Sequence, residues 1–301
     1  MKHIIESQQF TLEILLKLFK RADELRNTSS DSLKGKVLTT LFYEPSTRTR
    51  LSFEAAMLKL GGQVMGTENA KEFSSIAKGE SLEDSIRVIA GYSDAIVMRH
   101  SETGSAEKAA LVSSAPIING GDGKGQHPTQ ALLDIYTLYR ELGRIENIKI
   151  AMVGDLASGR TVRSLCYLLG KFPGIEITFV SPENLKISYD IKEYLNKHQV
   201  PFREETDLGK ILPEIDAVYM TRIQKERISQ EDYQNAKGKY VINETNLQLI
   251  KPDAIVMHPL PHIEEINLPI ELEKNDKRIA YFRQAENGLY IRMALLEEIM
   301  A

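Results

Sequence analysis

Short apolar runs alternate with helical stripes along most of the chain. The predicted strands are residues 37–43, 63–67, 95–98, 116–119, 149–153, 175–180, 217–220, 240–242 and 254–257. Apolar positions at helical spacing predict helices over residues 11–26, 53–60, 81–90, 128–142, 187–195, 229–236 and 284–299. This alternation indicates the α/β class, with two doubly wound domains, each built on a central and mainly parallel sheet flanked by helices.

The pattern breaks after the helix that ends near Leu142. Residues 141–146 are mostly polar around a glycine, and a new α/β series begins at Lys149. We therefore predict one domain over residues 1–143 and a second over 144–283, with the last helix, 284–301, packing back onto the first domain. Residues 71–81 and 120–126 lack a clean period, and we predict loops there.

One strand-to-helix turn concentrates hydrogen-bond donors. Glu44-Pro45-Ser46-Thr47-Arg48-Thr49-Arg50 separates the strand at 37–43 from the helix at 53–60, with Ser46 or Thr47 at the N-cap. The first N–H groups of a helix have no intrahelical partner, and the helix dipole makes this end partly positive. A simple cap beside solvated arginines needs only one hydroxyl group. The row of donors instead predicts a site for a doubly charged anion such as phosphate.

Further polar residues follow other predicted strands. In open α/β sheets, ligands bind beyond the carboxyl ends of the strands. Arg99 ends a strand of the first half, and His127 and Gln130 share one face at the start of a helix. In the second half, the residues at such places are Arg160, Arg222 and Gln224. Each of these residues alone could have a purely structural role, but their common position at strand ends favours ligand binding.

Composition narrows the functional classes. The 301 residues are 42% apolar and 27% charged, with net charge −4 and a pI near 6.0. This balance argues against a nucleic-acid or acidic-membrane surface and makes a cluster of arginines more telling. The single cysteine, Cys166, lies in an apolar helical pattern, which predicts a buried reduced thiol. No segment resembles a signal peptide or a membrane span, so we expect a cytoplasmic protein.

The strand-end residues predict the kind of chemistry. Four arginines and a histidine are expected to converge, and no carboxylate pair, Cys-His pair or His-rich metal set occurs at these positions. Such a site binds several negative charges and polarises an oxygen atom, without a metal, a cofactor or a protein nucleophile. The turn at Gly154 lacks G-x-G-x-x-G, which argues against a nucleotide-dependent dehydrogenase.

These residues also carry a family resemblance. The motifs are Ser46-Thr47-Arg48-Thr49-Arg50, His127-Pro128-Thr129-Gln130, Gly154-Asp155 with Gly159-Arg160-Thr161-Val162, Arg222-Ile223-Gln224-Lys225-Glu226-Arg227 and His258-Pro259-Leu260-Pro261. In order and spacing they resemble the catalytic chains of the aspartate carbamoyltransferases, within the transcarbamylase superfamily, nearly end to end. Ornithine carbamoyltransferases carry H-C-L-P and an S-M-G loop, whereas this chain has Pro259 and no Ser-Met-Gly.

The resemblance implies roles for the residues of the first half. It places Ser46, Thr47, Arg48 and Thr49 on the phosphate of carbamoyl phosphate. It places Thr49, Arg99 and His127 at the carbonyl oxygen of that substrate, and Gln130 at its amide. Arg48, Thr49, Arg99 and His127 would thus be the catalytic residues.

The remaining matches concern the second substrate and a neighbouring subunit. Arg160, Arg222 and Gln224 would bind the two carboxylates of L-aspartate, while the backbone carbonyls of Leu260 and Pro261 would join Gln130 at the carbamoyl amide. Lys78, with Ser75 or Ser74, would reach in from a neighbouring chain of a homotrimer. The implied reaction yields N-carbamoyl-L-aspartate and phosphate in pyrimidine biosynthesis, with no cofactor.

Several points stay open at the level of sequence. His262 stands where several relatives have arginine, so its role is unassigned. No residue is an obvious base for the amine proton, and we hypothesise that the departing phosphate accepts it. Two alternatives are a transcarbamylase for another amine acceptor and a non-catalytic anion-binding subunit. The sequence does not indicate whether regulatory chains attach.

Overall fold

The computed structural model describes residues 2–223, 230 and 238–300, which form two compact units. Unit 1 comprises Met1–Leu133 and Ala285–Ala301, and unit 2 comprises Asp134–Gln284. The unit boundaries fall inside two long helices, α6 (Pro128–Leu142) and α13 (Tyr281–Met300). The domain junction expected at residues 143 and 144 stays a prediction.

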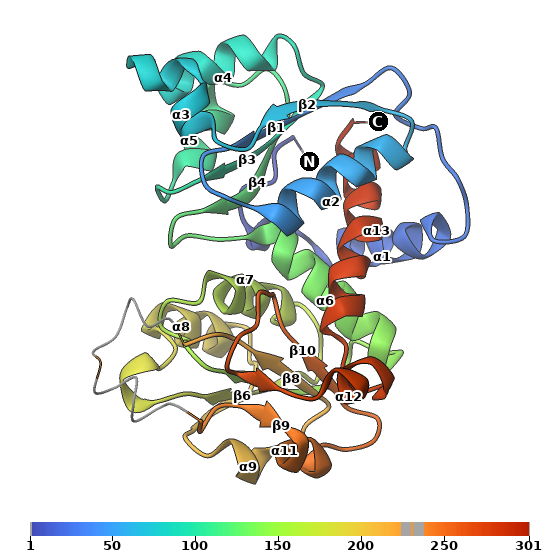
Figure 1. Ribbon diagram of the computed structural model, residues 1–301, viewed down its shortest axis with the longest axis vertical. Coiled ribbons are helices and arrows are strands. Elements are labelled where there is room, and N and C mark those ends of the chain that lie inside the picture. The colour runs from blue at the N-terminus through green and yellow to red at the C-terminus, as the bar shows by residue number, and fades with distance from the viewer. Residues whose placement is uncertain (1, 224–229, 231–237, 301) are drawn as a thin grey trace. The chain divides into compact units, whose positions relative to one another are not determined.

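Unit 1 is built on a four-stranded parallel sheet in the order β2-β1-β3-β4. Its strands are β1 (Val37–Phe42), β2 (Gln63–Thr67), β3 (Ala95–His100) and β4 (Ile117–Asp122). Its helices before α6 are η1 (Ser7–Gln9), α1 (Leu12–Leu25), α2 (Thr47–Lys59), α3 (Ala70–Phe73), η2 (Ser75–Lys78), α4 (Leu82–Ala90) and α5 (Ser105–Val112). Helices lie on both faces of the sheet, with α3, α4 and α5 on one and α2 on the other (Figure 1). Five of the six residues of β1 are buried, because both faces are covered.

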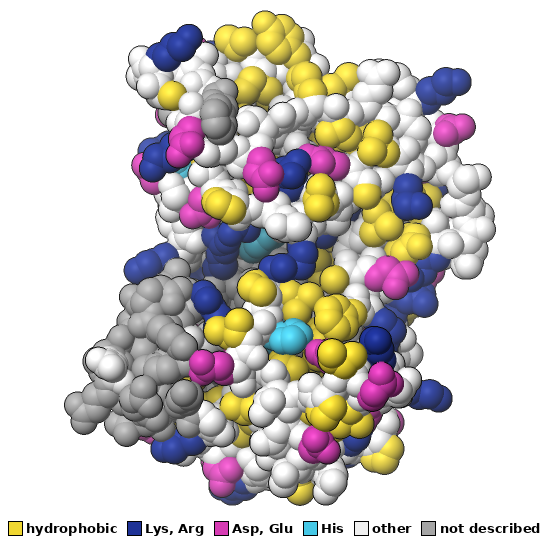
Figure 2. All heavy atoms as spheres, viewed as in Figure 1, with side chains coloured by type: hydrophobic (Ala, Val, Ile, Leu, Met, Phe, Trp, Pro, Cys, Tyr) yellow, Lys and Arg dark blue, Asp and Glu magenta, His cyan; other side chains and the backbone are white. Residues whose placement is uncertain are grey.

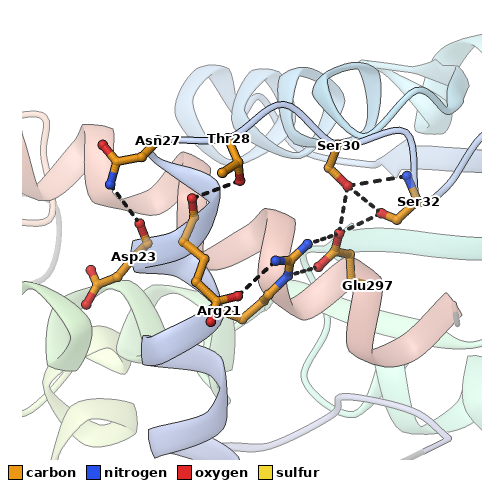
Figure 3. A network of polar contacts seen from close by, with 8 residues as sticks. Arg21, Asp23, Asn27, Thr28, Ser30, Ser32 and Glu297 are labelled. Carbon is orange, nitrogen blue, oxygen red and sulfur yellow. Dashed lines mark hydrogen bonds and ion pairs between the residues drawn. The ribbon is translucent and has the colours of Figure 1, made fainter.

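Helix α13 is anchored within unit 1 by a partly buried polar network. Glu297 receives two hydrogen bonds from the Arg21 guanidinium, at 2.6 and 3.0 Å, and further hydrogen bonds from the hydroxyls of Ser30 and Ser32 (Figure 3). A bidentate arginine pair with added hydroxyl donors satisfies the carboxylate almost completely. The network therefore joins α1, the segment before β1 and α13.

Unit 2 repeats the plan with a five-stranded parallel sheet in the order β10-β8-β5-β6-β7. Its strands are β5 (Lys149–Val153), β6 (Glu176–Val180), β7 (Phe202–Glu205), β8 (Ala217–Met220) and β10 (Ile255–Met257), and β9 (Ile242–Asn243) pairs separately with β11 (Ile266–Asn267). Its helices include α7 (Arg160–Leu169), η3 (Glu183–Leu185), α8 (Tyr189–Lys197), α9 (Leu208–Ile211), α11 (Glu244–Leu249) and α12 (Ile270–Asn275). The predicted fold class is confirmed.

Some local predictions were wrong. Residues 71–81 are not simply a loop, because α3 and η2 form there. Residues 120–122 extend β4. β7, β11 and α5 were not predicted, and the strand near Ile242 lies outside the main sheet. The helix predicted at 229–236 lies outside the described residues apart from Gln230.

Two further predictions concern burial. Cys166 is fully buried with its Sγ 3.6 Å from Met152 Sδ, and burial raises the pKa of this thiol well above its ordinary value. The expected buried thiol is therefore confirmed.

Among the helices that the structure describes, none is long and apolar enough to cross a bilayer.

Candidate active site

The unit 1 sheet has one point at which the chain reverses its direction of travel across the sheet. From β1 the chain moves outward to β2, then returns to β3 on the other side of β1 and continues to β4. Because successive crossovers cover opposite faces, a crevice opens beyond the carboxyl ends of β1 and β3 at such a switch point. The donor-rich turn follows β1, and Arg99 lies near the end of β3. The topology therefore brings these two predicted elements together.

The turn after β1 leaves its donors available. Ser46 is the N-cap of α2 in extended conformation, yet its side chain makes no capping hydrogen bond. The predicted N-cap position is therefore correct, but the hydroxyl group does not cap the helix. Thr47 and Arg48 are the first residues of α2, where the backbone N–H groups lack intrahelical acceptors. This helix end has the geometry of an anion site.

Arg48 and Arg99 generate a strongly positive field at this point. Partial burial and the nearby Arg99 lower the pKa of Arg48, although an arginine keeps its charge at neutral pH. Burial also lowers the pKa of Arg99, while Glu44 opposes that shift. The Arg99 Nε donates to Glu44 Oε2 at 3.3 Å. Sequence reasoning gave Glu44 no role, although a carboxylate directly before a cationic turn is a signal for such a pair.

Thr49 and His127 meet at the same edge of the unit 1 sheet. The Thr49 hydroxyl lies 3.3 Å from His127 Nε2, and both side chains are more than nine-tenths buried. Asp122 fixes the loop before His127, because its carboxylate accepts the backbone N–H groups of Gln126 and Gly104. Gln130 lies one turn further along α6 and is also buried. Of the residues predicted to face the carbamoyl group, the structure thus brings Thr49 and His127 into contact.

The segment predicted to serve a neighbouring chain lies on the surface. Ser75 and Lys78 are exposed on η2. Ser74 is half-buried, and its hydroxyl donates to the carbonyl of Ala70 within α3. Of the two serines left open by the sequence, Ser75 therefore has the more accessible side chain.

Unit 2 has its own switch point, between β5 and β8. The chain runs outward from β5 to β6 and β7, then returns to β8 and β10. Arg160 begins α7 shortly after β5, and Arg222 follows β8 by two residues. Both are half-buried. The predicted arginines of the second half therefore flank adjacent strand ends, as expected of a ligand site.

The close approach of these two strand ends requires a glycine. Gly154 follows β5 with φ +117°, and a Cβ atom there would lie 2.2 Å from the carbonyl oxygen of Thr221. Thr221 in turn donates its hydroxyl to Val153 O at 2.8 Å. The glycine thus lets the backbone before Arg222 sit against the end of β5.

Of the other site residues predicted in unit 2, the structure describes two. Leu260 and Pro261 lie in the turn after β10, with the former half-buried and the latter exposed. Gln224 lies outside the described residues.

In the part of the chain that the structure describes, no group of three or more His, Cys, Asp and Glu side chains could hold a metal ion. Figure 2 shows acidic and basic side chains interspersed over one face of the molecule.

Comparisons with known proteins give matches along nearly the whole chain. Residues 2–140 match the family model "Aspartate/ornithine carbamoyltransferase, carbamoyl-P binding domain", and residues 146–299 match "Aspartate/ornithine carbamoyltransferase, Asp/Orn binding domain". Aspartate carbamoyltransferase 1, chloroplastic, from Pisum sativum is 54% identical over 99% of this chain and 78% of its own length.

Solved structures of aspartate transcarbamoylases are also similar to this chain. The catalytic subunit of aspartate transcarbamoylase from M. jannaschii is 46% identical, with TM-score 0.92 over 99% of this chain and 98% of its own. The Trypanosoma cruzi aspartate transcarbamoylase in complex with carbamoyl aspartate and phosphate is 37% identical, with TM-score 0.93 over 100% of this chain and 96% of its own. The chain therefore belongs to the aspartate/ornithine carbamoyltransferase family and, within it, to the aspartate carbamoyltransferases.

Proposed function

We propose that this chain transfers the carbamoyl group of carbamoyl phosphate to the amine of L-aspartate, giving N-carbamoyl-L-aspartate and phosphate. The observation that carries the proposal is the placement of cationic residues at both switch points: Arg48 and Arg99 in unit 1, Arg160 and Arg222 in unit 2. Two anionic substrates need two such sites. The T. cruzi relative has been solved with carbamoyl phosphate and aspartate together.

Unit 1 supplies the groups for carbamoyl phosphate. Ser46, Thr47 and Arg48 take the phosphate at the start of α2. The buried Thr49 and His127 side chains, together with Arg99, face the carbonyl oxygen, on which negative charge develops as the amine attacks. Losing one such donor typically costs about 2.7–4 kcal/mol of transition-state stabilisation.

The reaction needs the free amine of aspartate as the nucleophile. A carbon–nitrogen bond forms at the carbamoyl carbon, and the bond to the phosphate oxygen breaks. The phosphate leaves with the electron pair, and it also takes the amine proton. Holding two anions at attack distance can contribute roughly 7–11 kcal/mol, the larger share of the catalysis proposed here.

Unit 2 supplies the groups for L-aspartate. Arg160, Arg222 and Gln224 bind its two carboxylates, and the carbonyls of Leu260 and Pro261, with Gln130, accept from the carbamoyl amide. Lys78 and Ser75 complete the site of a neighbouring chain, in a homotrimer or a larger assembly. The exposure of both side chains on η2 supports this part of the proposal. The cytoplasmic location stays a prediction, and the attachment of regulatory chains stays open.

An assay with carbamoyl phosphate and a panel of amines tests the function. We expect turnover with L-aspartate and none with L-ornithine, because cations flank the second switch point. For Arg222→Ala we expect a large rise in the KM for aspartate together with a lower kcat. Turnover only with another amine would favour a different transcarbamylase. Tight carbamoyl phosphate binding without any turnover would favour a non-catalytic subunit.

A further inference from the structure

The turn after β10 holds its backbone in an uncommon conformation. Leu260 has φ 56°, in the left-handed region that leucine seldom adopts, and the peptide bond to Pro261 is cis. The Leu260 side chain packs against the apolar core of unit 2. A left-handed leucine persists only where the surroundings hold it in place.

The imidazole of His258 holds this turn directly. The Leu260 N–H donates to His258 Nδ1 at 2.7 Å, and His258 Nε2 lies 2.9 Å from Glu265 Oε1. A backbone N–H can only donate, so Nδ1 carries no proton and Nε2 must carry it. The ring therefore donates to Glu265, which fixes both its tautomer and its orientation.

Both members of this pair are buried. His258 is 2% exposed and Glu265 is 6% exposed. Glu265 also accepts the Ile263 N–H at 3.2 Å. Burial raises the pKa of Glu265, but the hydrogen bonds from His258 and the backbone outweigh it, and the pKa lies below its ordinary value. The acceptor is therefore an ionised carboxylate at neutral pH.

The backbone of His258 is held by a second pair of hydrogen bonds. Its N–H donates to Gln284 Oε1 at 2.8 Å, and Gln284 Nε2 donates to Asp134 Oδ1 at 2.6 Å. Asp134 and Gln284 are at most 1% exposed. With both its main chain and its ring held, His258 has little freedom to move away from Leu260.

We propose that His258 is a positioning residue for carbamoyl transfer, because its ring holds Leu260 in the conformation that presents the carbonyls of Leu260 and Pro261 to the carbamoyl amide. The inference rests on the proposed function, which assigns those carbonyls to the substrate. Glu265 supports it by keeping Nδ1 free of a proton. Neither side chain is required to touch the substrate.

Two substitutions separate the functions of the two ring nitrogens. In His258→Asn, the amide oxygen can take the place of Nδ1 and accept the Leu260 N–H. In His258→Gln, the amide nitrogen can take the place of Nε2, but nothing accepts from Leu260. We expect His258→Gln to lower kcat/KM for carbamoyl phosphate about tenfold or more, and His258→Asn to rescue most of that loss. The KM for aspartate should change little in both.

Matched controls test whether the effect is specific. His262→Asn removes another histidine–glutamate pair from the same turn, since His262 Nε2 lies 3.2 Å from Glu273 Oε1. This variant should keep the unmodified kcat/KM for carbamoyl phosphate. Glu265→Gln keeps an acceptor for Nε2–H and should fall between the unmodified chain and His258→Gln. Thermal unfolding of each variant separates loss of the fold from loss of the turn.

A spectroscopic readout on the unmodified chain does not depend on folding of the variants. The nitrogen-15 spectrum of histidine-labelled protein should show His258 as the neutral Nε2–H tautomer, its signals assigned by their absence from His258→Asn or, should that chain not fold, from the shifts that Glu265→Gln causes. A protonated Nδ1, or equal kcat/KM in the Asn and Gln variants, would overturn the inference. Failure of the unmodified chain to form carbamoyl aspartate would instead contradict the proposed function.

Discussion

At the scale of single residues, the candidate site of unit 1 combines groups whose charge and burial differ sharply. Thr49 and His127 are buried together, whereas Arg48 and Arg99 form a cationic pair whose repulsion Glu44 partly relieves. Like charges near one another are unfavourable without an anion. An incoming phosphate is therefore stabilised by the N-terminus of α2, and it also reduces the repulsion between Arg48 and Arg99.

Arg48→Ala should lower kcat strongly and leave the fold intact. The arginine is assigned to the leaving phosphate throughout the reaction, so we expect kcat to fall by about 10²–10³-fold. Steady-state kinetics and thermal unfolding measure the two quantities. Lys59→Ala, which removes an exposed cation at the other end of α2, should leave kcat unchanged. Near-normal turnover of Arg48→Ala would remove Arg48 from the site.

The positions of the candidate residues at strand ends could be predicted because turns after parallel strands have a recognisable composition. Arg99 and Arg222 were found by their place after apolar runs. The pairing of Arg99 with Glu44 was signalled only by a carboxylate before a cationic turn, because it depends on the path of neighbouring strands. The pairing of His258 with Leu260 could not be predicted, because it depends on one unusual φ angle. Sequence patterns report period and composition, not these angles.

At the scale of elements, the two switch points determine where the candidate site residues lie. In each unit the strands on either side of the reversal carry the arginines, and the short turns after them set the distances. The long, apolar strands and helices were predictable from their periodicity. The edge strand β7, with sequence Phe-Arg-Glu-Glu, is mostly polar, and α3 has only four residues, so neither produced a clear pattern.

Gly154→Ala should weaken aspartate binding as well as the fold. The added Cβ would lie 2.2 Å from Thr221 O, next to Arg222, and the positive φ costs a residue with a Cβ about 1–3 kcal/mol. Gly143→Ala is the control, because its φ is +67° but nothing lies within 4 Å of the added atom. Equal unfolding free energies and equal aspartate KM values in the two variants would contradict the close-approach argument.

The network around Glu297 predicts a dependence of stability on pH. Burial raises the pKa of Glu297, but hydrogen bonds from Arg21, Ser32 and Ser30 outweigh it and lower the pKa below the ordinary 4.5. The carboxylate therefore contributes its full stability above that ordinary value, and the contribution is lost as the pH falls through the lowered pKa.

Glu297→Gln should thus lower the free energy of unfolding by about 1–2 kcal/mol at neutral pH. The difference in unfolding free energy between this variant and the unmodified chain should narrow as the pH falls below the ordinary pKa of glutamate. Denaturant titrations across this range measure it. Glu298→Gln, which breaks only the pair with the exposed Lys17, should have a much smaller effect. A gap that does not change with pH would argue against an ionised carboxylate in the network.

At the scale of the whole molecule, the proposal requires more than one chain. Arg48 is assigned to the chain's own site and Lys78 to that of a neighbour. This division could be expected only from family resemblance, because exposure of a lysine on a short helix is common on any surface. The particle size and the sharing of sites therefore need a direct test.

Mixing inactive variants provides that test. Trimers of Lys78→Ala chains lack the donated lysine at every site, and trimers of Arg48→Ala chains lack the phosphate arginine. After subunit exchange, each mixed trimer should contain one site with both residues intact, and activity should reappear. The same mixing with two Arg48→Ala preparations is the control. Mixed trimers without activity would show that each site belongs to one chain.

The division of unit 1 between residues 1–133 and 285–301 has a consequence for biosynthesis. A ribosome completes all of unit 2 before it adds the last part of α13, whose Ile291, Leu295 and Leu296 are fully buried in the finished protein. The apolar surface that α13 covers in unit 1 therefore stays exposed while the intervening polypeptide is translated, and in this interval we expect the nascent chain to need a chaperone.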